Sequence, residues 1–279
     1  MHTSAAEADS AKQLPRDWEE SLQLIDNLPA RSSDPPRTAV FDLDNTLLIH
    51  DVGDAVFTLL RRRSLEGGLP GISCPLPLSG AQYQRMRKSE RRREAYCLAV
   101  TAMAGLEPAT VVAATREVMN WPGKWLEADG VRVPVPRADP LMLRLLDRLR
   151  SMKFAIYVIS ASNHFSVRTT VSEYLGLPPQ RAWGILPIAV TGENGSPVLT
   201  DKLVDPVPYG HGKPELFHRE LGDRPILVGA GDSISDIPIL NLTSPKGLVI
   251  WAGPPDIPNR LPCPFRHPGN VRLHVRTGA

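Results

Sequence analysis

Short apolar runs alternate along this chain with segments in which apolar residues recur at helical spacing. The runs predict strands at 38–43, 154–160, 184–190, 225–229 and 247–251. The first, second and fourth are almost continuously apolar, as expected for strands of a parallel sheet that is covered on both faces. Helical periodicity predicts helices at 140–152 and 165–175. This alternation predicts an α/β fold with a doubly wound, Rossmann-like parallel sheet.

A long interval between the first strand and the helix at 140–152 interrupts the alternation. It has helical periodicity at 81–104 and 109–120 and no convincing strand. A connection of this length with its own helices is typical of a small unit inserted into a sheet domain. We therefore expect an N-terminal extension over 1–36, an α/β core formed by 37–50 and 138–279, and an inserted helical cap over 51–137.

Three further segments have recognisable patterns. The segment 188–209 has strand-like arms around Asn194-Gly195, a dipeptide typical of hairpin turns. Helical spacing predicts a helix at 17–28, with Asp17 as its N-cap. The proline-rich tail has one short strand expected at 271–275. The terminal segments either support a homodimer or pack on the core, and no sequence feature decides between these alternatives.

Composition fits a globular protein of 279 residues, with 42% hydrophobic and 22% charged residues. A net charge of +2 is too small to predict a nucleic-acid surface. The three cysteines are widely spaced without a CxxC or paired histidine pattern, which argues against a disulfide framework or a zinc site. There is no apolar stretch of membrane length and no pattern of a secretory signal. We expect a cytoplasmic protein that binds neither nucleic acid nor membrane.

Two acidic residues end the first apolar run, in the order Asp42-Leu43-Asp44-Asn45-Thr46. Neither carboxylate can be buried unpaired, so both are expected at the carboxyl end of the strand, where open α/β sheets bind ligands. Strand periodicity places Asp42 and Asp44 on the same side. Two carboxylates this close cannot both ionise without a cation, so either their protonation states separate or a metal intervenes. Taken alone, the motif is equally consistent with a turn after a strand.

A second acidic group, GAGDSISD at 229–236, follows the fourth predicted strand. Asp232 and Asp236 are four residues apart at a strand-to-helix junction, where both can reach a site; alone, Asp232-Ser233 would simply cap a helix. Together the two motifs supply four carboxylates, whose combined charge predicts a hard divalent cation. Mg²⁺ is the natural choice, because no histidine or cysteine cluster accompanies these oxygen ligands.

Two other residues complete the candidate site. Ser160 closes the second predicted strand beside a helix N-terminus, a position suited to an anion, although an N-cap explains it equally well. Lys213 follows two glycines in Tyr209-Gly210-His211-Gly212-Lys213. Lysines are usually exposed and solvated, but the carboxylate groups elsewhere make Lys213 a candidate partner for them.

These motifs, FDLDNT, the VIS strand end, the GHGK lysine and GDSISD, resemble in order and spacing the four motifs of the haloacid dehalogenase superfamily. The stretches IHDVGDAVF, VISAS and PVPYGHGK are similar to those of its phosphoserine phosphatase-like branch, including phosphocholine phosphatase-like members. The resemblance covers about residues 38–250, and the insertion lies where that family carries a helical cap. It implies a Mg²⁺-dependent phosphatase that hydrolyses a small phosphomonoester.

The resemblance also implies a role for each motif residue. Asp42 would attack phosphorus to form an aspartyl-phosphate, and Asp44 would serve as general acid and then as general base. Mg²⁺ would be held by Asp42, the backbone carbonyl of Asp44, and Asp232. Ser160, Lys213 and Asn45 would bind the phosphoryl oxygens. Asp236 would orient the lysine or a metal-bound water.

Substrate choice is expected to depend on the insertion. Asp51 or Asp54 would favour a cationic or hydroxyl-rich substrate, although N-capping explains either acid equally well. Trp121 and Trp125 would form part of a cage for a quaternary amine, or pack in the core as a pair at i and i+4. The basic run at 85–93 is expected to be a solvated helix face from which one arginine reaches a substrate anion. Two alternative functions remain: a phosphotransferase with the same intermediate, and a non-catalytic binding protein.

Overall fold

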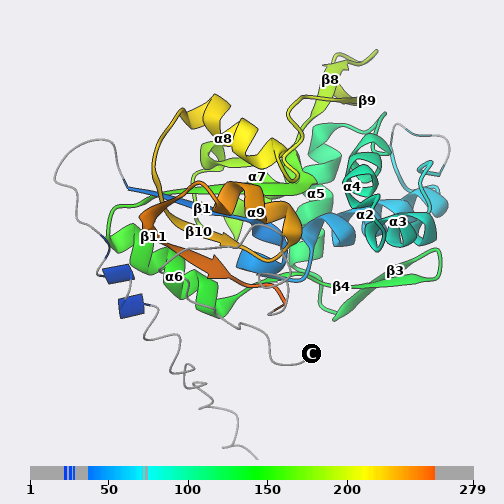
Figure 1. The fold of residues 1–279 in the computed structure, drawn as a ribbon. Helices are drawn as coiled ribbons and strands as arrows, with labels where there is room; N and C mark the ends of the chain where they lie inside the picture. Colours follow the sequence, from blue (N-terminus) through cyan, green and yellow to red (C-terminus); the bar gives the residue numbers. More distant parts are fainter. Residues whose placement is uncertain are drawn as a thin grey trace, which may run out of the picture.

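The computed structural model describes residues 22, 23, 25, 26, 28, 37–70, 72 and 75–254. Its centre is a five-stranded sheet with the order β11-β10-β1-β6-β7, and every neighbouring pair is parallel (Figure 1). The strands are β1 (Thr38–Phe41), β6 (Ala155–Asn163), β7 (Ala182–Ile185), β10 (Ile226–Gly231) and β11 (Thr243–Trp251). The chain therefore winds outward from β1 in both directions, as predicted.

Helices cover both faces of this sheet. On one face lie α6 (Pro140–Ser151) and α7 (His164–Glu173), and on the other α8 (Gly212–Leu221) and α9 (Ile237–Leu240) (Figure 1). Strand periodicity explains the two layers, because Phe41 belongs to the apolar core under α6 whereas the adjacent Val40 packs with Leu216 and Phe217 of α8. The doubly wound α/β fold is thus confirmed.

The segment between β1 and α6 forms a separate group of elements beside one end of the sheet (Figure 1). It contains α2 (Val52–Leu65), α3 (Gly80–Arg87), α4 (Arg92–Thr101), α5 (Pro108–Met119), β3 (Trp125–Ala128) and β4 (Val131–Pro134). Two short antiparallel strands, β2 (Leu48–Ile49) and β5 (Arg137–Ala138), pair at the two ends of this segment. The boundaries at 50/51 and 137/138 stay a prediction, and this pair is the natural stem for such an insertion.

The expectation that this segment lacks strands was wrong, because β3 and β4 form an antiparallel hairpin. Burial alternates along β3, with Leu126 and Ala128 buried. The turn is Asp129-Gly130, with φ of 52° and 70°, and this dipeptide is a common hairpin signal. The Asp129 carboxylate accepts from Arg61 Nε of α2 at 2.6 Å, which ties the turn to the helices. The strands are too short for their period to stand out from the surrounding helical pattern.

The strand expected at 184–190 is in fact two strands in different sheets. β7 ends at Ile185 in the parallel sheet, and β8 (Pro187–Thr191) begins the hairpin with β9 (Pro197–Leu203). Pro187 has no N–H to donate to a ladder, so the chain leaves the central sheet at this point. The hairpin predicted around Asn194-Gly195 is confirmed, and it projects from the body of the protein (Figure 1).

Helix starts follow the expected capping chemistry. Asp139 caps α6, its carboxylate accepting from Leu141 N at 2.8 Å, and Asn163 rather than Ser160 caps α7. None of the helices in the described ranges is both long and apolar enough to cross a bilayer. Of the N-terminal helix, Leu22, Gln23, Ile25 and Asp26 are helical. Its expected cap Asp17, the strand at 271–275, Cys74 and Cys263 lie outside the described residues.

Candidate active site

The turn after β1 presents the first two carboxylates. Asp42 still belongs to the sheet, because its backbone N–H donates to Ala230 of β10 at 2.9 Å. The chain then makes a wide turn over Leu43–Leu47 in which Asn45 has a φ of 59°. Asparagine tolerates this left-handed conformation better than most residues, which explains its position. This turn holds Asp42 and Asp44 at the carboxyl end of the strand.

Lys213 joins the two acidic loops at this edge of the sheet, those after β1 and β10. Its Nζ donates to Asp42 Oδ1 and to Asp236 Oδ1, both at 2.6 Å. Lys213 is 1% exposed, in the first turn of α8. The sequence prediction that this lysine departs from the usual exposed state is confirmed, and its charge lies between two carboxylates from β1 and β10.

The charges in this group do not balance. The single ammonium group of Lys213 pairs with both Asp42 and Asp236, and a carboxylate oxygen of Asp232 lies within 4.8 Å of theirs. Burial raises the pKa of Asp42 well above its ordinary value; Lys213 lowers it, and neighbouring carboxylates, Asp236 first among them, raise it again. Burial lowers the pKa of Lys213, but its two carboxylate partners outweigh burial and hold the pKa above its usual range. The lysine is therefore charged, and the excess negative charge favours uptake of a proton or a cation.

The loop after β10 holds Asp236 in one orientation. Its Oδ2 accepts from Asp232 N at 3.1 Å, from Ser233 N at 2.9 Å and from Ser233 Oγ at 3.0 Å. Its Oδ1 accepts from Lys213. Because both oxygens already have donors, Asp236 orients Lys213 and shapes the loop.

The carboxylates of Asp42, Asp232 and Asp236 are close enough to hold a metal ion. One oxygen from each lies within 4.8 Å of the others. These residues offer only oxygen atoms as ligands, so the site suits a hard divalent cation better than zinc. Since Asp236 is fully engaged, Asp42 and Asp232 are the better direct ligands. The residues present thus fit the expected cation.

Asp44 has surroundings different from those of Asp42. Its Oδ1 accepts from Val52 N at 2.7 Å, and its Oδ2 accepts from Ser160 Oγ at 2.9 Å and Ser162 Oγ at 2.7 Å. Burial raises the pKa of Asp44 to about 7, and the charge of Asp51 adds to the rise, while these hydrogen bonds oppose it. A carboxyl group with a pKa near neutrality can both give and take a proton at physiological pH.

Ser160, the serine singled out from the sequence, lies beside Asp44. Ser160 is 0% exposed, and its hydroxyl both donates to Asp44 and accepts from Ser162 N at 3.0 Å. Ser162 was not singled out from the sequence, although it lies two residues along the same strand and therefore on the same side as Ser160. Strand periodicity was the signal that would have found it.

The two candidate specificity acids form a buried network with side chains of α3. Asp51 caps α2, its Oδ1 accepting from Asp54 N at 2.9 Å, so the capping explanation is correct for Asp51. Arg87 of α3 forms ion pairs with Asp54 Oδ2 and, at 3.4 Å, with Asp51 Oδ2. Tyr83 OH donates to Asp54 Oδ1 at 2.7 Å. Within the basic run, Arg87 is thus the arginine that turns inward; Tyr83, four residues earlier on the same helix face, was missed.

Core packing, the alternative to a cage, is correct for Trp121 but not for Trp125. α5 ends at Met119, and Trp125 begins β3 with 46% of its surface exposed. Its ring packs under Arg132, whose guanidinium carbon lies 4.6 Å from the ring centre. Trp121 packs at the margin of the main apolar core. Neither ring contacts the carboxylates described above through any hydrogen bond or ring interaction in the described structure.

Comparison with known proteins is consistent with this geometry. The family model of haloacid dehalogenase-like hydrolases matches residues 39–241. No curated protein matches the chain. A conserved protein of unknown function from Anaerococcus prevotii is 13% identical with a TM-score of 0.58, over 84% of this chain and 85% of that one.

Two further solved structures have the same fold. A protein of unknown function from Bordetella pertussis is 16% identical with a TM-score of 0.56, over 81% of this chain and 94% of that one. A substrate-bound phosphoserine phosphatase is 16% identical with a TM-score of 0.50, over 84% of this chain and 95% of that one. At such identities the likeness concerns the fold alone.

Proposed function

Because the chain belongs to the haloacid dehalogenase-like hydrolase family, we propose that it is a Mg²⁺-dependent phosphatase acting on a small phosphomonoester. The observation that carries this proposal is the contrast between two carboxyl groups two residues apart. Asp42 contacts the charged Lys213, whereas Asp44 has a pKa of about 7 and contacts only neutral donors. A nucleophile and an acid–base group require these two environments.

In the proposed reaction, an oxygen of Asp42 attacks phosphorus and forms an aspartyl-phosphate. The bond from phosphorus to the ester oxygen breaks, and Asp44 gives its proton to that oxygen. Asp44 then takes a proton from water, which attacks phosphorus and releases inorganic phosphate and free Asp42. Mg²⁺, held by Asp42, Asp232 and the backbone carbonyl of Asp44, supplies positive charge to the phosphoryl oxygens when bound.

Other residues stabilise the charge on the transferred group. Lys213 lowers the pKa of Asp42, which favours its ionised form, and binds a phosphoryl oxygen, while Asp236 holds the lysine in position. Ser160 and Asn45 complete the phosphate contacts. Ser160 donates to Asp44 in the structure, so its contact with phosphate requires the hydroxyl to turn toward the ligand.

The decisive experiment is an assay of small phosphate esters with and without Mg²⁺, followed by mass measurement of the acid-quenched protein. We expect Mg²⁺-dependent release of phosphate and a phosphoryl group covalently attached at Asp42. Added alcohol separates the alternatives, because a phosphotransferase would form a new ester from it. Absence of turnover for every ester would instead favour a non-catalytic binding protein.

The pH dependence follows from Asp44. The first step needs its protonated form, so kcat/KM should fall as pH rises above about 7, approaching tenfold per pH unit. An ester whose leaving group departs without a proton should show a much flatter alkaline limb. The Asp44→Asn variant should lose the limb altogether. An alkaline limb that is the same for both esters would argue against Asp44 as the acid.

The metal site gives a separate prediction. Asp232→Asn removes one anionic ligand, so the Mg²⁺ concentration for half-maximal activity should rise at least about tenfold. Asp201→Asn, on an exposed part of β9, is the matched control and should change nothing. Titration of activity with Mg²⁺ after chelation measures both. An unchanged Mg²⁺ requirement in Asp232→Asn would remove Asp232 from the ligand set.

Substrate choice remains a proposal that concerns Asp51 and Asp54. These two carboxylates face a single guanidinium, that of Arg87, so the network has a net negative charge beside Asp44. This charge favours a cationic or hydroxyl-rich leaving group and disfavours an anionic one. Trp121 and Trp125 stay predictions, and their packing gives no support for a cage.

A further inference from the structure

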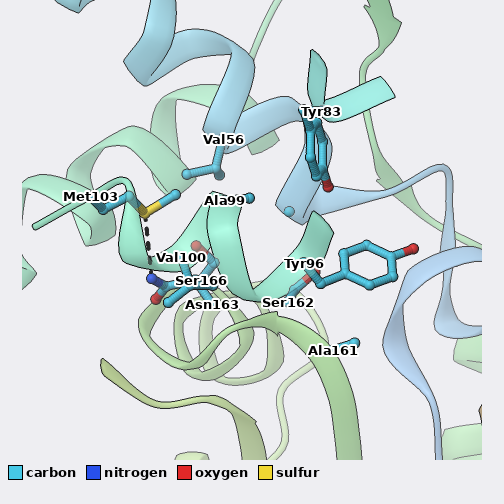
Figure 2. A pocket seen from close by; sticks show the side chains of 11 residues that line it. Val56, Tyr83, Tyr96, Ala99, Val100, Met103, Ala161, Ser162, Asn163 and Ser166 are labelled. Carbon is cyan, nitrogen blue, oxygen red and sulfur yellow. Dashed lines mark hydrogen bonds between the residues drawn. The ribbon is translucent and has the colours of Figure 1, made fainter. Parts of the chain in front are cut away.

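A small pocket lies next to the proposed acid–base residue, and Figure 2 shows the side chains that line it. Ser162, whose hydroxyl donates to Asp44 Oδ2 at 2.7 Å, forms part of its wall. The cavity is about 10 Å³, which is room for about one water molecule. The leaving group of the substrate, whose oxygen Asp44 protonates, would therefore be separated from this pocket by the side chain of Ser162 alone.

Small and apolar side chains form most of the wall. α2 contributes Gly53 and Val56, and α4 contributes Ala99 and Val100. Gly53 is required for close approach, because a Cβ at this position would lie 2.4 Å from Ser162 Oγ. These helices belong to the insertion, whereas Ser162 belongs to the sheet. The pocket thus lies where the insertion meets the catalytic loops.

The wall of the pocket also contains a buried amide donor. Asn163 is 2% exposed, and its Oδ1 is used to cap α7 by accepting from Phe165 N at 2.9 Å. Its Nδ2 contacts Met103 Sδ at 3.4 Å, as the dashed line in Figure 2 shows. Thioether sulfur is a weak acceptor, and this amide has two hydrogens to donate. Among the described residues, Nδ2 has no other acceptor.

We infer that this pocket receives the leaving group of the substrate, and that the leaving group is a short alcohol with a second oxygen that accepts a hydrogen bond from Asn163 Nδ2. The inference rests on the proposed function. A hydroxyl or carbonyl oxygen satisfies the buried amide better than sulfur does. The cavity admits only the end of such a group, and a longer chain requires the flexible side chain of Met103 to change rotamer. Branched or ring-containing alcohols conflict with Ala99 and Val100.

The test compares hydroxyalkyl phosphates of two to four carbons with alkyl phosphates that have the same number of non-hydrogen atoms. Wild-type kcat/KM should be at least about tenfold higher for the best hydroxyalkyl ester than for its alkyl partner. Asn163→Ser keeps a good helix cap but withdraws the amide donor, so this ratio should fall to about one. Asn120→Ser, at the exposed end of α5, is the matched control and should keep the wild-type ratio.

A second variant tests the size of the pocket. Ala99→Leu fills it, so kcat/KM for the longer esters should fall at least about tenfold more than kcat/KM for methyl phosphate. This variant decides the matter if Asn163→Ser fails to fold. Three results would overturn the inference and leave the proposed phosphatase function standing. They are a wild-type ratio near one, an Asn163→Ser ratio equal to that of wild type, and equal losses for all esters in Ala99→Leu. No turnover of any ester by wild type would overturn the proposed function and this inference with it.

Discussion

Asp42→Asn should reduce phosphate-ester turnover by at least about 10⁴-fold in kcat, the scale of losing a nucleophile. The amide cannot form the aspartyl-phosphate, and it carries no charge to share with Lys213 or a cation. Release of inorganic phosphate in the presence of Mg²⁺ measures the loss. The acid-quenched variant should also carry no covalent phosphoryl group, unlike the wild-type protein.

The substitution changes few atoms, so the fold should persist. Thermal unfolding of Asp42→Asn should be cooperative, and Asp201→Asn is the matched exposed control with wild-type turnover. Two outcomes would contradict the mechanism. One is a loss of less than about tenfold, and the other is a covalent phosphoryl group at a residue other than Asp42.

The catalytic end of the sheet was predictable because its residues follow strands directly. Parallel strands bring their carboxyl ends to one edge, so Asp42, Asp236 and Lys213 were expected to meet before any contact was known. The fold followed from the same pattern, since continuous apolar runs specify strands that are buried on both faces. The sequence of residues within and directly after each strand was sufficient to predict the sheet and its catalytic edge.

The insertion was harder to predict because its contacts are distant in the sequence. Arg87 looked like part of a solvated basic face, yet it pairs with Asp51 and Asp54 across the entry to α2. Burial of Ser162 beside Asp44 depends on how β6 lies against β1. The pKa of Asp44 is a sum of such contacts, and no run of residues specifies it.

Lys213→Met should destabilise the folded protein by about 3–5 kcal/mol at pH 7, the usual cost of removing one partner from a buried ion pair. Methionine is similar in length, so the main change is the lost charge between Asp42 and Asp236. Each carboxylate would lose a donor at 2.6 Å while remaining buried. Urea denaturation of the variant and of Lys202→Met, an exposed control on β9, measures the difference.

Two conditions should restore stability to Lys213→Met without restoring activity. Without the lysine, the folded-state pKa of Asp42 rises further above its unfolded value, so the folded variant binds protons more tightly and gains stability as pH falls. Mg²⁺ bound at Asp42 and Asp232 replaces part of the missing charge in the same way. Turnover should stay low in both cases, because the phosphoryl oxygens still lack the ammonium group. Stability equal to wild type at pH 7 without Mg²⁺ would mean that Lys213 does not neutralise this carboxylate cluster.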